Sequence, residues 1–260
     1  MCPDFKNRMR FICNRAANED IFDPGLRRSV SFVLLGAKMK FRLFPLFALV
    51  AWVPLLQADS LLNDLNEAQR LELEHGGQVV IMQEMEGKPW PRVRLYQRVD
   101  ATPEDVAAVF FDYQNAKSFI PKVIKSDISR QVSPCILEVD YGIDIPILPD
   151  EFYTARNELT AGKDGSYCVS WNLVRALQTK ASEGSLYIER FGEGSVIRYT
   201  NLVTPGSSMA VILKVPAIDQ MRGTVRAIVR QVERQKKEHP EALKKEILSL
   251  QEALSKKPQE

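Results

Sequence analysis

The amino-acid sequence predicts an α+β fold, in which a run of β-strands is interrupted once by two short helices and is followed by one long helix. Residues 99–123 have the pattern of a strand that leads into an amphipathic helix and then into a second short helix. Only strand-like segments follow until residue 204, and a helical apolar period begins at residue 211. With 45% apolar residues, the 260-residue chain can bury one sizeable core.

Residues 61–73 open the folded region with apolar residues at helical spacing, and the Gly76-Gly77 pair stops this short helix. Two strands are expected next, at residues 78–86 and 92–99. One glycine and two prolines in residues 87–91 enforce a loop between these strands.

The two short helices are predicted by the residues at their ends. Thr102 can cap the first helix, Pro103 suits its first turn, and the acidic pair Glu104-Asp105 favours the positive end of the helix dipole. Its apolar residues face inward: Val106, Val109 and Phe110. A second helical stretch closes at Phe119-Ile120-Pro121, and a new strand begins at Val123.

Six strands are expected after the helices, and glycine-rich turn signals separate most of them. The two clearest turns are residues 162–165 and 192–194. The expected strands are residues 123–132, 136–143, 152–159, 167–173, 184–191 and 196–204.

The long helix is predicted by apolar residues that recur three and four positions apart and form one face: Val211, Val215, Ile218, Met221, Val225, Ile228, Val229 and Val232. Pro216 marks either a kink or the first turn of this helix. Another face carries a row of arginines, which we interpret as a solvated surface: Arg222, Arg226, Arg230 and Arg234. Residues 241–254 predict a further, more polar helix.

Residues 39–58 have the layout of a secretory signal, with a basic start, an uncharged run from Leu43 to Leu56 and the small residue Ala58. The run is shorter than the roughly 20 residues of a membrane span, and two prolines weaken it further. We therefore predict a cleaved signal, with a retained membrane anchor or a buried helix as the alternative. Residues 1–38 show no clear period, and we interpret them as a non-native or disordered extension before a true start at Met39.

The predicted organisation is an extension (1–38), a signal peptide (39–58), a folded domain (59–238) and a polar helical tail (239–260). Removing residues 1–58 takes away nine basic and four acidic residues, which leaves 26 against 29 and a net charge of −3. No basic stripe interleaved with aromatic residues is present, so nucleic acid is not an expected partner.

The folded part carries little catalytic equipment. Its two histidines, His75 and His239, lie at predicted helix ends and are expected on the surface. Metal-ligand spacings, a nucleophile elbow, a phosphate-binding glycine loop and a dinucleotide fingerprint are all missing from the sequence. Cys135 and Cys168 permit either a disulfide or two buried thiols, of which we favour the thiols. We expect no metal and no cofactor, and we assign no catalytic residue.

These segments together resemble the START-like, helix-grip superfamily, also called SRPBCC, which includes polyketide cyclase-like and coenzyme Q-binding proteins. The resemblance covers Leu65 to Gln235 and implies a secreted bacterial member of the superfamily. The residues that carry it are 99–123, 169–173, 183–186, 196–200 and Pro205-Gly206 before the long helix. It implies a curved antiparallel sheet that grips the long helix around a mostly apolar cavity. Members bind lipids, sterols, quinones, polyketides or plant hormones, and some catalyse ring closure.

The implied cavity would be lined by residues of the later strands and of the long helix: Trp171, Leu173, Tyr187, Tyr199, Met209, Leu213 and Met221. Arg198 faces solvent if Tyr199 faces the cavity, whereas the reversed register would let Arg198 neutralise an anionic head group. Asp140 and Asp144 share one strand face, and we interpret them as a solvent-facing pair and not as an acid and base.

We predict that the protein binds or transports a hydrophobic small molecule of the lipid or quinone class, in the periplasm or outside the cell. The sequence favours the absence of enzymatic activity. A monomer with transient membrane contact is expected, and a retained anchor would still place the domain outside the cytoplasm. One alternative is a cyclase or dehydratase that acts on a polyketide-like substrate. A second alternative is a protein-interaction module.

Overall fold

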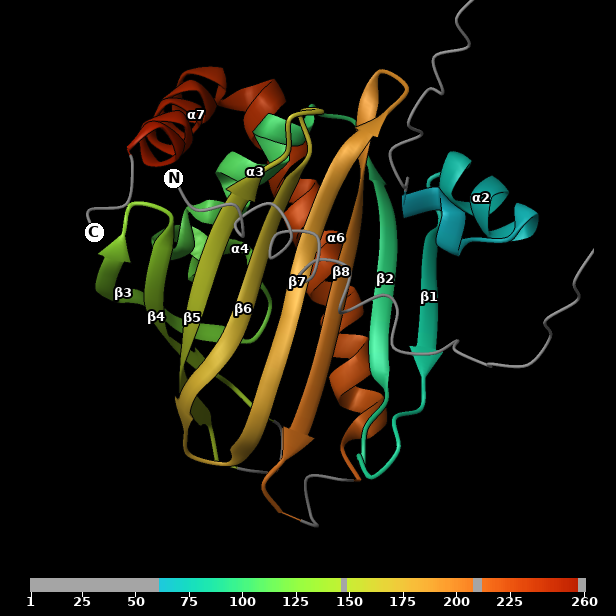
Figure 1. Cartoon of the computed structure of the whole chain (residues 1–260), viewed down its shortest axis with the longest axis vertical. Helices are drawn as coiled ribbons and strands as arrows, with labels where there is room; N and C mark the ends of the chain where they lie inside the picture. The colour runs from blue at the N-terminus through green and yellow to red at the C-terminus, as the bar shows by residue number, and fades with distance from the viewer. Residues whose placement is uncertain (1–60, 146–148, 208–211, 257–260) are drawn as a thin grey trace, which may run out of the picture.

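The structure, a computed structural model, describes residues 61–145, 149–207 and 212–256. The predicted extension and signal, residues 1–58, lie outside the described residues, as does Met209. The described strands form one eight-stranded antiparallel sheet in the order β1-β2-β8-β7-β6-β5-β4-β3. This sheet curves in front of the long helix α6 in Figure 1, which confirms the predicted α+β, helix-grip architecture.

Every predicted strand is present, although several ends differ. The first strand stops at Gln83, earlier than predicted, and β7 begins at Thr179, because it pairs with the end of β8 as far as Pro205. The strands are β1 (Gln78–Gln83), β2 (Arg92–Val99), β3 (Val123–Ser133), β4 (Ile136–Ile143), β5 (Glu151–Ala161), β6 (Tyr167–Ala176), β7 (Thr179–Phe191) and β8 (Gly194–Pro205).

The chain crosses the sheet once through its short helices. After β2 it forms α3 (Pro103–Phe111), η2 (Tyr113–Asn115) and α4 (Ala116–Phe119), and then enters the far edge of the sheet at β3. Successive antiparallel strands return toward the start, so the last strand, β8, lies beside β2 (Figure 1). The long helix α6 follows β8 in the chain and packs on one face of this sheet.

Local capping chemistry starts the two amphipathic helices. The Asp105 N–H donates to Thr102 Oγ1 at 3.2 Å and the Thr102 N–H donates to the Asp105 carboxylate at 2.9 Å, which confirms the predicted cap of α3. The leading helix differs from its prediction, because Asn66 builds a capping box with Gln69 and begins a new helix. The segment is therefore split into η1 (Leu61–Asp64) and α2 (Glu67–Glu74).

The long helix α6 (Lys214–Glu238) contributes the central apolar face of the main core. Pro216 is its third residue and thus belongs to the first turn, where a missing N–H leaves no helical hydrogen bond unmade. Val225, Ile228 and Val232 are fully buried against the sheet and α3. None of the described helices is long and apolar enough to cross a bilayer.

The predicted C-terminal tail forms a packed helix, α7 (Pro240–Ser255). Its Leu243 and Leu250 are buried in the main core, and α7 lies against α3 (Figure 1). The Gln251 amide donates to the Glu104 carboxylate at 2.8 Å and joins the two helices at the surface. The helix α7 therefore packs on the same core as the sheet and α6.

A second, smaller core lies on the outer face of the sheet, opposite α6. Leu61, Leu65 and Leu73 pack there on Tyr96 and Val196, and all five side chains are buried. Residues 61–74 therefore cover the outer face at β1, β2 and β8. Both faces of these strands are covered, so most residues of β2 and β8 are buried whichever way they point.

The Asp64 carboxylate holds residues 61–74 on the outer face of the sheet. The Asp64 carboxylate accepts from Tyr96 Oη and from Arg198 Nη1, both at 2.8 Å, and Arg94 Nη1 lies 3.9 Å away. The Arg198 guanidinium also lies 5.7 Å from the ring centroid of Tyr187. Asp64 thus ties η1 to a buried arginine of β8.

Replacing Asp64 with asparagine is expected to lower the free energy of unfolding by about 1–3 kcal/mol, because a charge-assisted acceptor is removed from a buried guanidinium. Urea denaturation measures the change. The control is Asp127→Asn, since its ion pair with Lys117 at 3.3 Å is half-exposed on both sides and is worth less than about 1 kcal/mol. Equal losses in the two variants would contradict the anchoring role of Asp64.

Candidate functional site

Alternation along the strands decides which side chains face α6. On β8, Ile197, Tyr199 and Val203 pack in the main core, whereas Val196 packs in the outer core. On β6, Val169 and Trp171 face the same inner side. The inner face of the sheet is therefore the surface on which a ligand between sheet and helix would lie.

Four of the seven predicted site residues have inner positions. Trp171, Tyr199 and Met221 belong to or pack against the main core, and Leu173 follows Trp171 on the same face of β6. Leu213 is the half-buried N-cap residue of α6. Met209 lies outside the described residues.

Tyr187 is the residue that the structure places elsewhere. Its side chain packs against the outer core, and its hydroxyl donates to Ser166 Oγ at 3.2 Å. The inward neighbours on β7 are Leu186 and Ile188, which are fully buried in the main core. The predicted place of Tyr187 in the cavity is therefore wrong by one strand position.

A glycine allows the central aromatic contact of the inner face. Trp171 on β6 reaches across β7 to Tyr199 on β8, with ring centroids 5.2 Å apart. Gly184 of β7 lies between them, and a Cβ at this position would come within 2.4 Å of Trp171 Cζ2. Phe110 of α3 also packs against Trp171, with the two ring centroids 6.3 Å apart.

Two tyrosines of the inner face were not predicted from the sequence. Tyr141 on β4 and Tyr153 on β5 are directly paired, and their rings stack at 5.2 Å. The pattern Leu137, Val139, Tyr141, with acidic residues between them, contained the signal for Tyr141. For Tyr153 the signal is the cross-strand pairing itself, which a single sequence does not contain.

These inner-face side chains form one group, which we name the aromatic recess: Tyr141, Tyr153, Trp171, Leu173 and Tyr199. All five keep part of their surface accessible although they lie on the helix-facing side of the sheet. Burial nevertheless raises the pKa of Tyr141, Tyr153 and Tyr199 well above 10.

The tyrosines on this side of the sheet lie near enough to influence the ionisation of Tyr141. Burial is the largest cause of the raised pKa of Tyr141, and the next is charge repulsion from Tyr113, Tyr153 and Tyr199. A side-chain hydrogen bond with Asn157 acts in the opposite direction. We name these four residues the tyrosine group: Tyr113, Tyr141, Tyr153 and Tyr199.

Two buried polar atoms beside these tyrosines have no hydrogen-bond partner among the described residues. They are Tyr113 Oη, on η2, and Asn201 Oδ1, two residues after Tyr199 on β8. Unpaired buried polar atoms are costly, so a ligand oxygen or a water is the natural partner for each. The inner surface thus combines aromatic walls with a few neutral polar groups.

The charged residues that the sequence analysis considered as candidates lie away from the aromatic recess. Arg198 points outward, as expected when Tyr199 points inward, but η1 covers it and Asp64 binds it, so it does not face solvent. Both histidines are exposed at helix ends, as predicted. In the described part of the chain, no cluster of His, Cys, Asp and Glu is suited to hold a metal ion.

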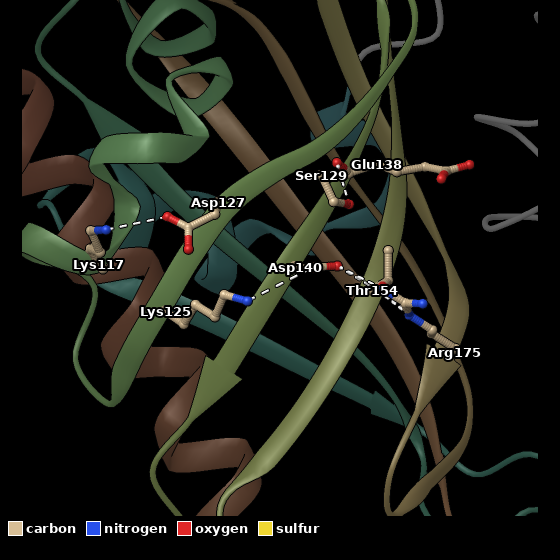
Figure 2. A network of polar contacts seen from close by, with 8 residues as sticks. All are labelled: Lys117, Lys125, Asp127, Ser129, Glu138, Asp140, Thr154 and Arg175. Carbon is tan, nitrogen blue, oxygen red and sulfur yellow. Dashed lines mark hydrogen bonds and ion pairs between the residues drawn. The ribbon is translucent and has the colours of Figure 1, made fainter.

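Asp140 belongs to a polar network on the outer face of β3 to β6 (Figure 2). It accepts from Thr154 Oγ1 at 2.6 Å, and Lys125 Nζ and Arg175 Nη2 lie 3.7 and 3.6 Å away. The hydrogen bond from Thr154 is the largest cause that lowers the pKa of Asp140. Asp144 pairs with Lys122 at 2.7 Å. The two aspartates are therefore surface ion-pair partners and not an acid and base.

Cys135 carries a free thiol, which lies 3.1 Å from the Ala253 carbonyl oxygen of α7. It therefore forms no disulfide with Cys168. Burial raises the pKa of this thiol, which makes it a poor nucleophile at neutral pH.

Exposed apolar side chains gather at one end of the sheet, which we name the apolar end: Phe152, Val174, Leu177, Ile212 and Val215. Their exposed fractions run from 43% to 72%. The Leu177 N–H donates to the Phe152 carbonyl at 3.1 Å, which joins the β6–β7 turn to the start of β5. The first turn of α6 lies at the same end, at the bottom of Figure 1. Tyr153 of the aromatic recess directly follows Phe152 in β5.

An antiparallel sheet that holds a C-terminal helix, with α3 and α4 inserted after the second strand, is a START-like, helix-grip fold. The STAR-related lipid transfer protein of Xanthomonas axonopodis has a similar structure, with a TM-score of 0.55 and 18% identity over 60% of this chain and 94% of that one. Human STARD10 is similar over 67% of this chain and 82% of its own, with a TM-score of 0.51 and 16% identity. No family model and no curated protein matches the sequence.

Proposed function

We propose that the protein binds and carries a hydrophobic small molecule, of the lipid or quinone class, in the aromatic recess. The observation that carries this proposal is the accessible aromatic surface on the inner face of the sheet, beside the unpaired Tyr113 and Asn201 atoms. The fold shared with a lipid transfer protein and with STARD10 is consistent with it. Apolar walls with a few oriented polar groups are typical of small-molecule sites.

The polar groups select for a ligand that has neutral oxygen atoms as well as apolar surface. A raised pKa keeps the tyrosine group protonated at neutral pH, so each hydroxyl is available as a hydrogen-bond donor. Asn157 and Asn201 add amide groups to the same inner face. Ester, alcohol or quinone oxygens match these donors, whereas a pure hydrocarbon leaves them unpaired.

Changing Tyr141 and Tyr199 together to phenylalanine is expected to weaken binding of a ubiquinone analogue or a monoacylglycerol about 5- to 150-fold, since two lost neutral hydrogen bonds are together worth about 1–3 kcal/mol. Binding of a hydrocarbon probe without oxygen should stay within about twofold, since only the hydroxyls change. Fluorescence titration measures both affinities.

Tyr187→Phe is the matched control for these variants, because it removes a tyrosine hydroxyl on the outer face of the same sheet. It should leave both affinities unchanged. An equal loss in the control, or an equal loss for both kinds of ligand, would show that the tyrosine group does not contact the ligand.

We also propose that the apolar end contacts a membrane transiently during transfer of the ligand. Three strongly exposed apolar residues, Leu177, Ile212 and Val215, belong to this end of the sheet. Their insertion into a bilayer interface would stabilise docking through buried apolar area. Leu177→Ser with Val215→Ser should slow transfer between vesicles without changing affinity for a soluble ligand.

A cyclase or dehydratase remains the second candidate, and the hydroxyls of the tyrosine group are the observation that favours it. The tyrosine group would orient and polarise the carbonyl oxygens of a polyketide-like chain. General-base catalysis at neutral pH is disfavoured, because burial raises the pKa of every one of these hydroxyls. Turnover of a model polyketide chain that Tyr141→Phe abolishes would support this candidate.

For localisation we propose export through residues 39–58, with the folded domain in the periplasm or outside the cell. The basic start and the short uncharged run of these residues are the basis of the proposal. Expression from Met39 in an exporting host should yield a mature chain that begins near Asp59. An unprocessed mass would favour the membrane-anchored alternative.

A further inference from the structure

A polar hollow lies between the turn from α2 to β1 and the middle of α6, at the β1 edge of the sheet. Its volume is about 410 Å³, and its lining shares no residue with the aromatic recess. The lining residues are Glu72, Gly76, Gln78, Gln97, Arg222, Arg226, Val229 and Arg230. Three guanidiniums and two side-chain amides thus surround one space.

The helix and the edge strand hold the arginines in place. Arg222, Arg226 and Arg230 are spaced four residues apart on α6, so they lie above one another on one face. Gln78, the first residue of β1, faces them, and its Oε1 accepts from Arg222 Nε at 3.4 Å and from Arg226 Nη1 at 3.5 Å. Its Nε2 donates to the Arg222 carbonyl at 3.4 Å. A neutral amide therefore orients two of the three guanidiniums.

The positive charge of the hollow is not neutralised within the described residues. None of its three arginines forms an ion pair with a carboxylate there, whereas Arg198 and Arg175 each do. Glu72 is the single carboxylate of the lining, which leaves a formal charge of +2. Like charges four residues apart destabilise a helix, so an anion in the hollow would relieve their repulsion.

We propose that this hollow binds a phosphate-bearing ligand, either a soluble phosphate monoester or the head group of a phospholipid. A phosphate group offers several acceptor oxygens to guanidinium forks, and its negative charge, about −1.5 to −2 for a monoester and about −1 for the diester of a phospholipid, opposes the positive charge of the lining. Gln78, Gln97 and Gly76 line the other side of the hollow, which a flat surface row of arginines would lack. The site is independent of hydrophobic binding in the recess.

The test is calorimetric titration of the full chain with glycerol 3-phosphate at constant ionic strength, together with flotation on phosphatidylcholine vesicles with and without phosphatidylglycerol. The variant is Arg226→Ser with Arg230→Ser. Its matched control is Arg234→Ser, the next arginine of the row, which bonds Gln231 at 2.6 Å and does not line the hollow.

Saturable one-to-one binding of glycerol 3-phosphate is expected, with a loss of about tenfold or more in the double variant and less than about twofold in the control, as for charge-assisted hydrogen bonds. Binding to anionic vesicles alone, with the same dependence on Arg226 and Arg230, would assign the phosphate to a lipid head group. Equal losses in the variant and the control, or no binding in either assay, would overturn the proposal.

Discussion

Replacing Leu173 with tryptophan is expected to weaken binding of a dansyl-labelled fatty acid by about tenfold or more. Leu173 lies on the inner face of β6, two residues from Trp171, and is only half-buried. The larger indole would occupy the accessible part of the aromatic recess, where it would replace the ligand against the Trp171 and Tyr199 rings. Burial of an acyl chain contributes about 0.8 kcal/mol per methylene, so exclusion of even two methylenes accounts for the loss.

The adjacent residue supplies a matched control for this variant. Asn172 points to the opposite, outer face of β6 and is exposed, so Asn172→Trp adds the same side chain outside the recess. Its affinity for the fatty acid should stay within about twofold of wild type, since no recess contact changes. Thermal unfolding of both variants separates a blocked recess from a damaged fold. Unchanged binding in a folded Leu173→Trp protein would mean that the ligand lies elsewhere.

The second large effect expected is cooperative unfolding at alkaline pH, between about pH 11 and 12. Tyr96 and Tyr113 are fully buried, and burial raises the pKa of Tyr96 to about 12 and that of Tyr113 further. A tyrosine whose pKa is higher in the folded than in the unfolded state stabilises the fold fully below pH 10. That contribution is lost as the pH rises from 10 through the folded-state pKa.

Each such tyrosine removes about 1.4 kcal/mol of stability per pH unit above pH 10. Tyr96 and Tyr113 together therefore remove about 5 kcal/mol by pH 12, and the three tyrosines of the aromatic recess add to this loss. Since domains of this kind are stable by about 5–15 kcal/mol, the fold should fail within this interval.

Absorbance of tyrosinate and circular dichroism, recorded together against pH, measure this transition. Tyrosinate formation should coincide with loss of structure, and Tyr113→Phe should move the midpoint to higher pH, because one titrating group is removed. Tyr187→Phe should move it less, since Tyr187 is only partly buried. Smooth titration of all tyrosines near pH 10 in a folded protein would contradict the burial of these hydroxyls.

Much of the fold was predictable because local chemistry and strand alternation act within short segments. The Thr102 cap, the Pro103 start of α3 and the strand β2 followed directly from neighbouring residues. The split of the leading helix at Asn66 was missed, because a new cap competes with a continuous apolar period. The packing of α7 depends on contacts with α3, which lies about 140 residues earlier in the chain.

The candidate site was less predictable because side chains on both faces of β2, β7 and β8 are buried. Leu61 and Leu65 cover the outer face, so Tyr187 on that face packs against an apolar core, as Tyr199 does on the inner face. Periodicity cannot assign a direction when both directions are buried. The arginine row was visible in the sequence, but the hollow requires Gln78 and Gln97 from the sheet.

Native mass spectrometry of the protein purified from its exporting host, followed by organic extraction, tests the central claim most directly. The account predicts a non-covalent adduct with the mass of a lipid or quinone, which organic solvent releases and which is depleted in Leu173→Trp but not in Asn172→Trp. A wild-type protein that is empty, and that takes up no lipid or quinone after incubation, would contradict the assignment of the aromatic recess as a ligand site.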